Sequence, residues 1–156
     1  MASLAKMNLS VNDEVKVGVF NDVEFSVKQY LPFQEKVYLV TASVKDSVID
    51  GYVNQMVLDC TLHFGIVELY TDLNITKKMK ENVLETFDKI QSSGLLQAIL
   101  ELVPEDEYNY LFESALEITR KTDELVLSSV DGLASQRMNS EAILETIKGT
   151  TEESKE

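Results

Sequence analysis

The sequence predicts an α+β protein that is mostly α, in which an N-terminal β-hairpin is followed by a bundle of four to six helices. Apolar and polar residues alternate along residues 15–28, which is the two-residue period of a half-buried strand. After Pro32 the apolar residues recur at helical spacing. The chain of 156 residues has only six glycines and two prolines, which argues against an all-β or loop-rich fold.

The predicted hairpin has two short strands on either side of Asn21-Asp22, and two registers compete. A two-residue loop at Asn21-Asp22 sets Val19 opposite Glu24, so the apolar faces of the strands disagree. A three-residue loop, Phe20 to Asp22, aligns the apolar faces, and we favour it. It pairs Val19 with Val23, Val17 with Phe25, Val15 with Val27 and Glu14 with Lys28. Val17 and Phe25 are then both predicted to face the core.

Helical periodicity accounts for most of the remaining chain. The segment from about Val53 to Tyr70 is apolar on most sides and reads as a buried central helix, but its alternation also fits a strand, so both alternatives stay open. The expected inward face of the first helix is formed by Phe33, Val37, Val40, Val44 and Val48. Further helices are expected from Asn74 or Thr76 to Gly94, from Leu95 to Val103, from Pro104 to about Gly132, and from about Ser140 to Lys148.

The domain organisation follows from where apolar residues are dense. Residues 1–12 are predicted to form a flexible arm, and residues 13–131 a single globular domain. Residues 132–156 are predicted to form a weakly ordered helix and an acidic tail. Their few apolar anchors supply less stabilisation than the conformational entropy of ordering costs.

The charge balance bears on the class of partner. The net charge is −13, and residues 104–156 carry thirteen acidic side chains against five basic ones. This opposes nucleic-acid binding and docking on an anionic membrane, both of which need clustered cations. Cys60 is the single cysteine, so an intrachain disulfide is impossible and a reducing compartment is expected. No signal peptide or membrane helix is expected either.

Asp59, Cys60 and His63 are the residues most suggestive of chemistry. Zinc sites use three or four protein ligands, and this chain has one His and one Cys, so we expect no metal. Cys60 lies among apolar residues and is predicted to be a buried, inert thiol, with His63 at the edge of the helix. No Gly-rich phosphate loop or hydrolase elbow occurs, so we expect no cofactor and no enzymatic activity.

Two further groups of residues are weighed as sites. Acidic clusters such as Glu105, Asp106 and Glu107 are interpreted as a solvated surface at a helix start. Among the aromatics of that helix, Tyr108 and Phe112 are expected in the core and Tyr110 at least partly exposed. The candidate interface residues are Tyr110, Leu133, Ile143, Leu144 and Ile147.

Three segments carry a family resemblance: V-E-F-S-V-K-Q-Y-L-P-F-Q-E-K from Val23, E-L-Y-T-D-L-N-I-T from Glu68 and L-V-P-E-D-E-Y-N-Y-L from Leu102. In this order they resemble small proteins encoded among the virion morphogenesis genes of tailed phages and prophages of Gram-positive bacteria. The resemblance covers about residues 12–120. It implies a structural or assembly role and carries no catalytic residue.

We therefore expect a non-enzymatic structural or assembly protein of a tailed phage particle, at the head, the portal or the head–tail junction. Its partners would be other phage structural proteins, within a homo-oligomer or ring, and it would reside in the virion or in the host cytoplasm during assembly. Two alternatives stay open: a tail-assembly chaperone absent from the mature virion, and a cytosolic regulatory binding module.

Overall fold

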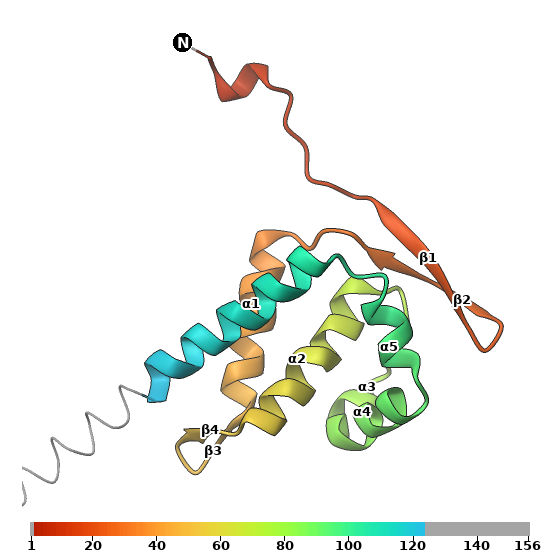
Figure 1. Cartoon of the computed structure of the whole chain (residues 1–156), viewed down its shortest axis with the longest axis vertical. Coiled ribbons are helices and arrows are strands. Elements are labelled where there is room, and N and C mark those ends of the chain that lie inside the picture. The colour runs from red at the N-terminus through yellow and green to blue at the C-terminus, as the bar shows by residue number, and fades with distance from the viewer. Residues whose placement is uncertain (1, 124–156) are drawn as a thin grey trace, which may run out of the picture. The chain divides into compact units, whose positions relative to one another are not determined.

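The computed structural model of the chain describes residues 2–123. The predicted helix from Ser140 and the tail lie outside this range. The chain divides into a first unit, Met1–Ile118, and a second unit that begins at Thr119. The first unit is an α+β arrangement that is mostly helical, with a hairpin at its N-terminal side, so the predicted fold class is confirmed (Figure 1).

The N-terminal segment contains a short 3-10 helix, η1 (Leu4–Lys6), and leads to the hairpin of β1 (Val15–Phe20) and β2 (Val23–Lys28). The strands are antiparallel, and Asn21 and Asp22 form a two-residue loop with φ angles of 49° and 63°. These left-handed angles are those of the hairpin turn that suits the twist of the strands, and Asn and Asp tolerate them. The three-residue loop that we favoured is therefore wrong.

The observed register turns the β1 valines away from the core. Val15 lies opposite Lys28, Val17 opposite Ser26 and Val19 opposite Glu24. The core side of β1 is formed instead by Lys16, Gly18 and Phe20, opposite Val27, Phe25 and Val23. A Cβ built on Gly18 would come within 2.7 Å of Phe25 and 2.6 Å of Leu102, so the missing side chain of Gly18 admits both. Phe25 is buried as predicted, whereas Val17 is 63% exposed.

Helix α1 (Phe33–Asp46) ends before Val48, which we expected on its inward face, because a second hairpin follows it. Strands β3 (Val48–Ile49) and β4 (Tyr52–Val53) are joined by Asp50 and Gly51, which have φ angles of 53° and 84°. An Asp-Gly pair is a strong signal for a two-residue hairpin turn. Val48 therefore belongs to a strand and is not part of the inward face of α1.

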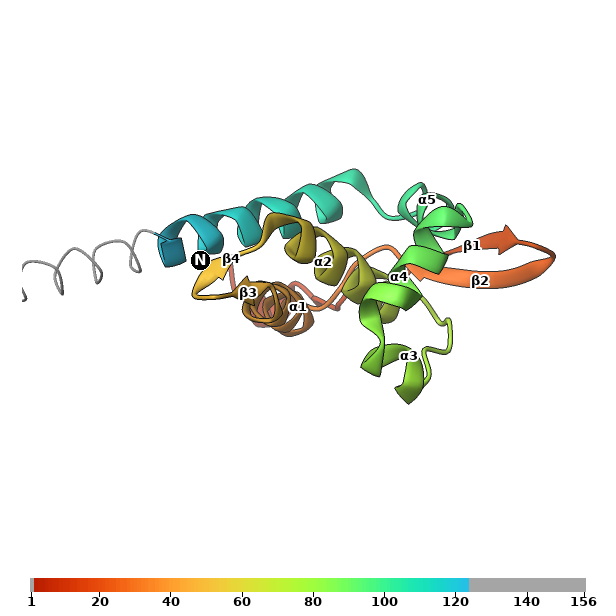
Figure 2. The same ribbon diagram turned by 90° about the horizontal axis from the view of Figure 1, so that it is seen from below.

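Helix α2 (Gln55–Tyr70) is the central helix, which settles the alternative between helix and strand. Asn54 caps it, since its side-chain oxygen accepts from the N–H groups of Met56 and Val57. Helices α1 and α2 lie side by side (Figures 1 and 2). A Cβ on Gly65 would clash with Leu39 Cδ1, so the absence of a side chain at Gly65 makes room for Leu39 of α1 against α2.

The predicted third helix is divided into α3 (Lys77–Glu81) and α4 (Val83–Ser92), because Asn82 leaves the helical region at φ −123° and ψ 57°. Thr76 caps α3, as one of the two predicted caps. Helix α5 (Leu95–Leu100) follows Gly94, whose φ is 86°. Residues 105–118 form the last helix of the first unit, and the described residues of the second unit, 119–123, are also helical.

The core of the first unit gathers side chains from the hairpin and from every long helix. Its largest fully buried members are Leu31, Leu62, Ile66, Tyr70, Ile99 and Leu111. Helix α2 supplies more of this cluster than any other element, which explains why it is apolar on most sides.

Candidate interaction surface

A buried ionic cluster holds the first unit together around Glu107. Lys36 Nζ lies 2.5 Å from Glu107 Oε1, and both side chains are more than nine-tenths buried. Glu107 Oε2 accepts from the Tyr70 hydroxyl at 2.8 Å and from the Leu31 N–H at 3.1 Å. Both carboxylate oxygens are thus engaged, and one residue joins α1, α2, the segment before α1 and the helix over residues 105–118.

The position of Glu107 corrects the interpretation of residues 105–107 as a solvated surface. Glu105 and Asp106 are exposed, but Glu107 is buried in the ionic cluster. Glu107 stands four residues before Leu111 and eight before Ala115, so it belongs to the buried stripe of the helix. This spacing was visible in the sequence, but its partner Lys36 could be identified only from the tertiary contact.

The ionic cluster also positions Tyr110, the first of the candidate interface residues. Lys36 Nζ lies 4.1 Å from the ring centroid of Tyr30 and 5.4 Å from that of Tyr110. The ammonium group is attracted to both aromatic faces. Tyr110 itself is 47% exposed, as its predicted role requires.

Tyr110 belongs to an exposed apolar surface with Phe33 and Val37 of α1, which we call the Tyr110 patch. Phe33 is 62% exposed and Val37 49%, so the prediction that both face inward is wrong. Val40 and Val44 are buried as predicted, and Lys36, Leu39 and Ser43 complete the buried face of α1. The hollow of the patch is lined by Phe33, Lys36, Val37, Val40, Thr41, Tyr110, Ser114 and Ile118.

A second exposed apolar surface lies on the hairpin, and we call it the valine face. It consists of Val15, Val17 and Val19, whose exposed fractions are 50%, 63% and 62%. All three point to one side of β1, because side chains two residues apart share a face of a strand. Sequence reasoning recognised the alternation but assigned this face to the core, so it missed the surface.

The residues singled out for chemistry all belong to α2, where Asp59 is exposed and the other two are buried. Cys60 is buried as predicted, and its burial, followed by the nearby Asp59 carboxylate, raises the pKa of the thiol. His63 is buried as well, which corrects its predicted place at the helix edge. Its ring packs 5.1 Å from that of Phe112, centroid to centroid.

Both ring nitrogens of His63 have partners. Nδ1 lies 2.8 Å from the Asp59 carbonyl oxygen, which can only accept, so Nδ1 carries a proton. In the neutral ring Nε2 then accepts from the Tyr108 hydroxyl at 3.1 Å. Within residues 2–123 no three His, Cys, Asp or Glu side chains are grouped so that they could hold a metal.

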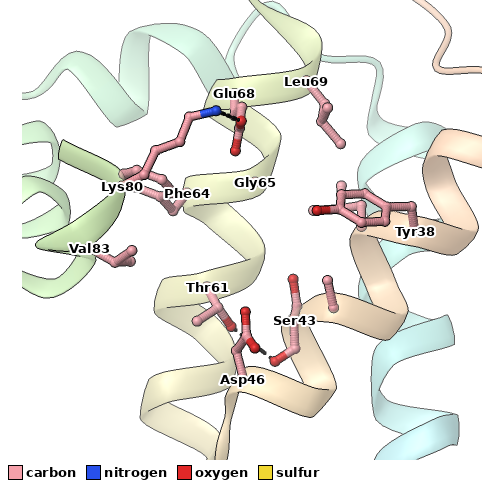
Figure 3. A pocket seen from close by; sticks show the side chains of 12 residues that line it. Tyr38, Ser43, Asp46, Thr61, Phe64, Gly65, Glu68, Leu69, Lys80 and Val83 are labelled. Carbon is pink, nitrogen blue, oxygen red and sulfur yellow. Dashed lines mark hydrogen bonds and ion pairs between the residues drawn. The ribbon is translucent and has the colours of Figure 1, made fainter. Parts of the chain in front are cut away.

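Lys80 of α3 borders a small cleft that is also lined by residues of α1, α2 and α4 (Figure 3). Within this cleft, Lys80 of α3 forms an ion pair with Glu68 of α2. Thr61 Oγ1 of α2 donates a hydrogen bond to the carbonyl oxygen of Ser43 in α1. Tyr38 and Asp46 line its α1 side. Lys80 and Glu68 are thus paired with each other within the cleft, and Lys77 pairs with Glu81 nearby.

Of the five candidate interface residues, the structure places Tyr110 alone. Leu133, Ile143, Leu144 and Ile147 lie outside the described residues. Two exposed apolar surfaces among the described residues, the Tyr110 patch and the valine face, add Phe33, Val37 and the three β1 valines to the candidates.

Comparisons with known proteins gave no match for this chain. No family model matches the sequence, and neither the curated proteins nor the solved structures gave a match. Within the part of the chain that the structure describes, no helix is long and apolar enough to cross a membrane.

Proposed function

We propose that the chain is a non-enzymatic structural or assembly protein of a tailed bacteriophage particle, at the head, the portal or the head–tail junction. The observation that carries the proposal is the pair of apolar surfaces, the Tyr110 patch and the valine face, that stay exposed beside a well-filled core. Contiguous exposed apolar residues with a polar surround are typical of protein–protein contact sites.

The buried polar groups support a structural role, because they are used to join elements of the fold. Glu107 engages Lys36, Tyr70 and the Leu31 N–H, and His63 engages Tyr108 and the Asp59 carbonyl. Each of these groups meets its hydrogen-bonding needs within the protein interior. This differs from the partly accessible, poised side chains of a catalytic centre.

The three segments of the family resemblance meet one another in the structure. Segment 23–36 contacts segment 68–76 through the hydrogen bonds of Ser26 with Asp72, and segment 102–111 through the Lys36–Glu107 pair. Gln29 Nε2 also donates to the Leu102 carbonyl at 2.9 Å. The motifs therefore connect parts of the fold that are distant in sequence. This fits a family whose shared residues maintain the fold and do not form a catalytic site.

Mass spectrometry of particles purified from the phage that carries the gene tests the proposal. We expect the chain among the virion proteins, and its complete absence from both particles and assembly intermediates would contradict the proposal. Presence in infected cells and in complexes with a tail component, but not in particles, would favour the chaperone alternative.

Variants of the Tyr110 patch test whether this surface makes the contact. Phe33→Asp and Tyr110→Ala should lower incorporation into particles, while the neighbouring exposed changes Gln34→Asp and Asn109→Ala should not. Thermal unfolding of each purified variant shows whether the fold is kept. Equal incorporation of all four variants would exclude the patch as a contact site.

A further inference from the structure

Strand β1 has an outer edge of unpaired backbone groups. The N–H of Gln29 donates to the carbonyl of Glu14, which marks residues 14 and 29 as a hydrogen-bonded pair of the ladder. Such pairs alternate along antiparallel strands, so Lys16, Gly18 and Phe20 also bond to β2. The N–H and C=O groups of Val15, Val17 and Val19 therefore point away from β2, and no partner for them occurs in the described part of the chain.

The opposite edge of the hairpin is already occupied. Ser26 of β2 receives a backbone hydrogen bond from Asp72 at 3.3 Å, and its own N–H donates to Asp72 Oδ1 at 2.8 Å. Val27 forms an isolated bridge with Thr71 beside this contact. Of the two edges of the sheet, the β1 edge is therefore the one that no described segment occupies, and β1 also carries the valine face.

This edge lacks most of the features that protect edge strands. It contains no proline and no bulge, and Lys16 is its single charged residue. The three valines beside the open backbone groups are half exposed or more. An unprotected edge of this kind is a template for addition of another strand.

We propose that a second copy of this chain adds its own β1 to this edge in the antiparallel direction, with Val15 opposite Val15 of the second copy. The inference rests on the proposed function, for which it names one partner. In this register Glu14 lies opposite Lys16 of the second copy, and two-fold symmetry makes this pairing twice. The ladder joins backbone groups of Val15 and Val17 to the second copy.

Charge decides between this register and its neighbours. Moving the two-fold axis by one residue in either direction along the strand sets Lys16 opposite Lys16 or Glu14 opposite Glu14. Like charges directly opposite each other on neighbouring strands destabilise the pairing. A register centred on Val17 sets Lys16 opposite Gly18 and gives no charge pair. The Val15 register is thus the one with complementary charges. On the exposed face it sets Val15 opposite Val15 and Val17 opposite Asp13 of the other copy.

Charge reversal in the full-length chain tests the contact. Glu14 and Lys16 are both exposed, so Glu14→Lys and Lys16→Glu should leave the fold intact, which thermal unfolding verifies. Each single variant should dimerise roughly threefold to tenfold more weakly than the wild type in sedimentation equilibrium. An equimolar mixture of the two variants should recover dimer, because the heterodimer pairs opposite charges at both positions, and the double variant should recover it as well.

A matched control lies on the other strand. Glu24→Lys changes an exposed charge on the same face of the hairpin but away from the β1 edge, so dimerisation should match the wild type. A wild-type chain that stays monomeric throughout a dilution series overturns the inference, as does a dimer that is insensitive to both single variants or is not recovered in the mixture. A monomer that is still found in purified particles overturns this contact and leaves the proposed function standing.

Discussion

Lys36 and Glu107 form a buried ion pair, 2.5 Å between Nζ and Oε1, across 71 residues of sequence. Burying two charges costs free energy, because both lose contact with water. The pair is stable because each partner makes further contacts. The carboxylate accepts from Tyr70 and Leu31, and the ammonium lies over the ring of Tyr30. Burial and the hydrogen bond to Glu107 both raise the pKa of Tyr70, so its hydroxyl remains a donor throughout the neutral range.

Breaking this pair from one side should be strongly destabilising. Glu107→Leu leaves the Lys36 charge buried without its partner, and we expect a loss of about 3–5 kcal/mol in the free energy of unfolding. The double change Lys36→Met with Glu107→Leu removes both charges and should cost clearly less than the two single changes together. Urea unfolding measures all three, and additive losses would contradict a coupled pair.

The two faces of the hairpin should respond differently to truncation. Phe25→Ala removes a fully packed ring and should cost about 3–5 kcal/mol. Val17→Ala lies on the exposed valine face and should change the free energy of unfolding by no more than about 0.5 kcal/mol in dilute protein. Chemical unfolding of both variants at low concentration, where association is negligible, provides the comparison, and a large cost at Val17 would restore the register that we first favoured.

The sequence predicted what depends on local patterning and failed where long-range packing decides. The class, the hairpin and the burial of Cys60 follow from composition and periodicity. Periodicity left α2 open between helix and strand, and the capping residues left Asn74 and Thr76 as alternatives until the structure decided both. The register failed because the valines were assumed to be buried, while Gly18, Phe25 and Leu102 fill that space.

The same cause explains the errors on the candidate surface. Phe33 and Val37 were placed inside because they share helical spacing with Val40, but Lys36 turns inward towards Glu107 and rotates the buried face of α1. A buried lysine in an apolar stripe is rare unless it is paired, so sequence patterning gives it little weight. Tyr110 was placed correctly because it stands off the stripe of Leu111 and Ala115.

Cys60 should react slowly with a thiol reagent in the native protein. It is 5% exposed, and burial raises the pKa of its thiol, so both access and the thiolate fraction are reduced at neutral pH. We expect modification to be much faster in denaturant, and Cys60→Ala to cost about 1–2 kcal/mol. Equal rates of modification in the native and denatured protein would contradict the buried position.

Asp72 should make the attachment of the hairpin sensitive to acid. The backbone N–H of Ser26 and then its hydroxyl donate to the carboxylate, and these bonds lower the pKa of Asp72 below its ordinary value. A carboxyl whose pKa is lower in the folded state stabilises above its unfolded pKa, and this contribution is lost as the pH falls through the folded pKa. Wild-type stability should therefore decline in that acidic window, whereas Asp72→Asn should start lower at neutral pH and decline less. Thermal unfolding across a pH series measures the difference. As a control, Glu24→Gln removes an exposed carboxyl of β2, the strand of Ser26, and should keep the wild-type dependence of stability on pH. Parallel curves for the wild type and Asp72→Asn would contradict the role assigned to Asp72.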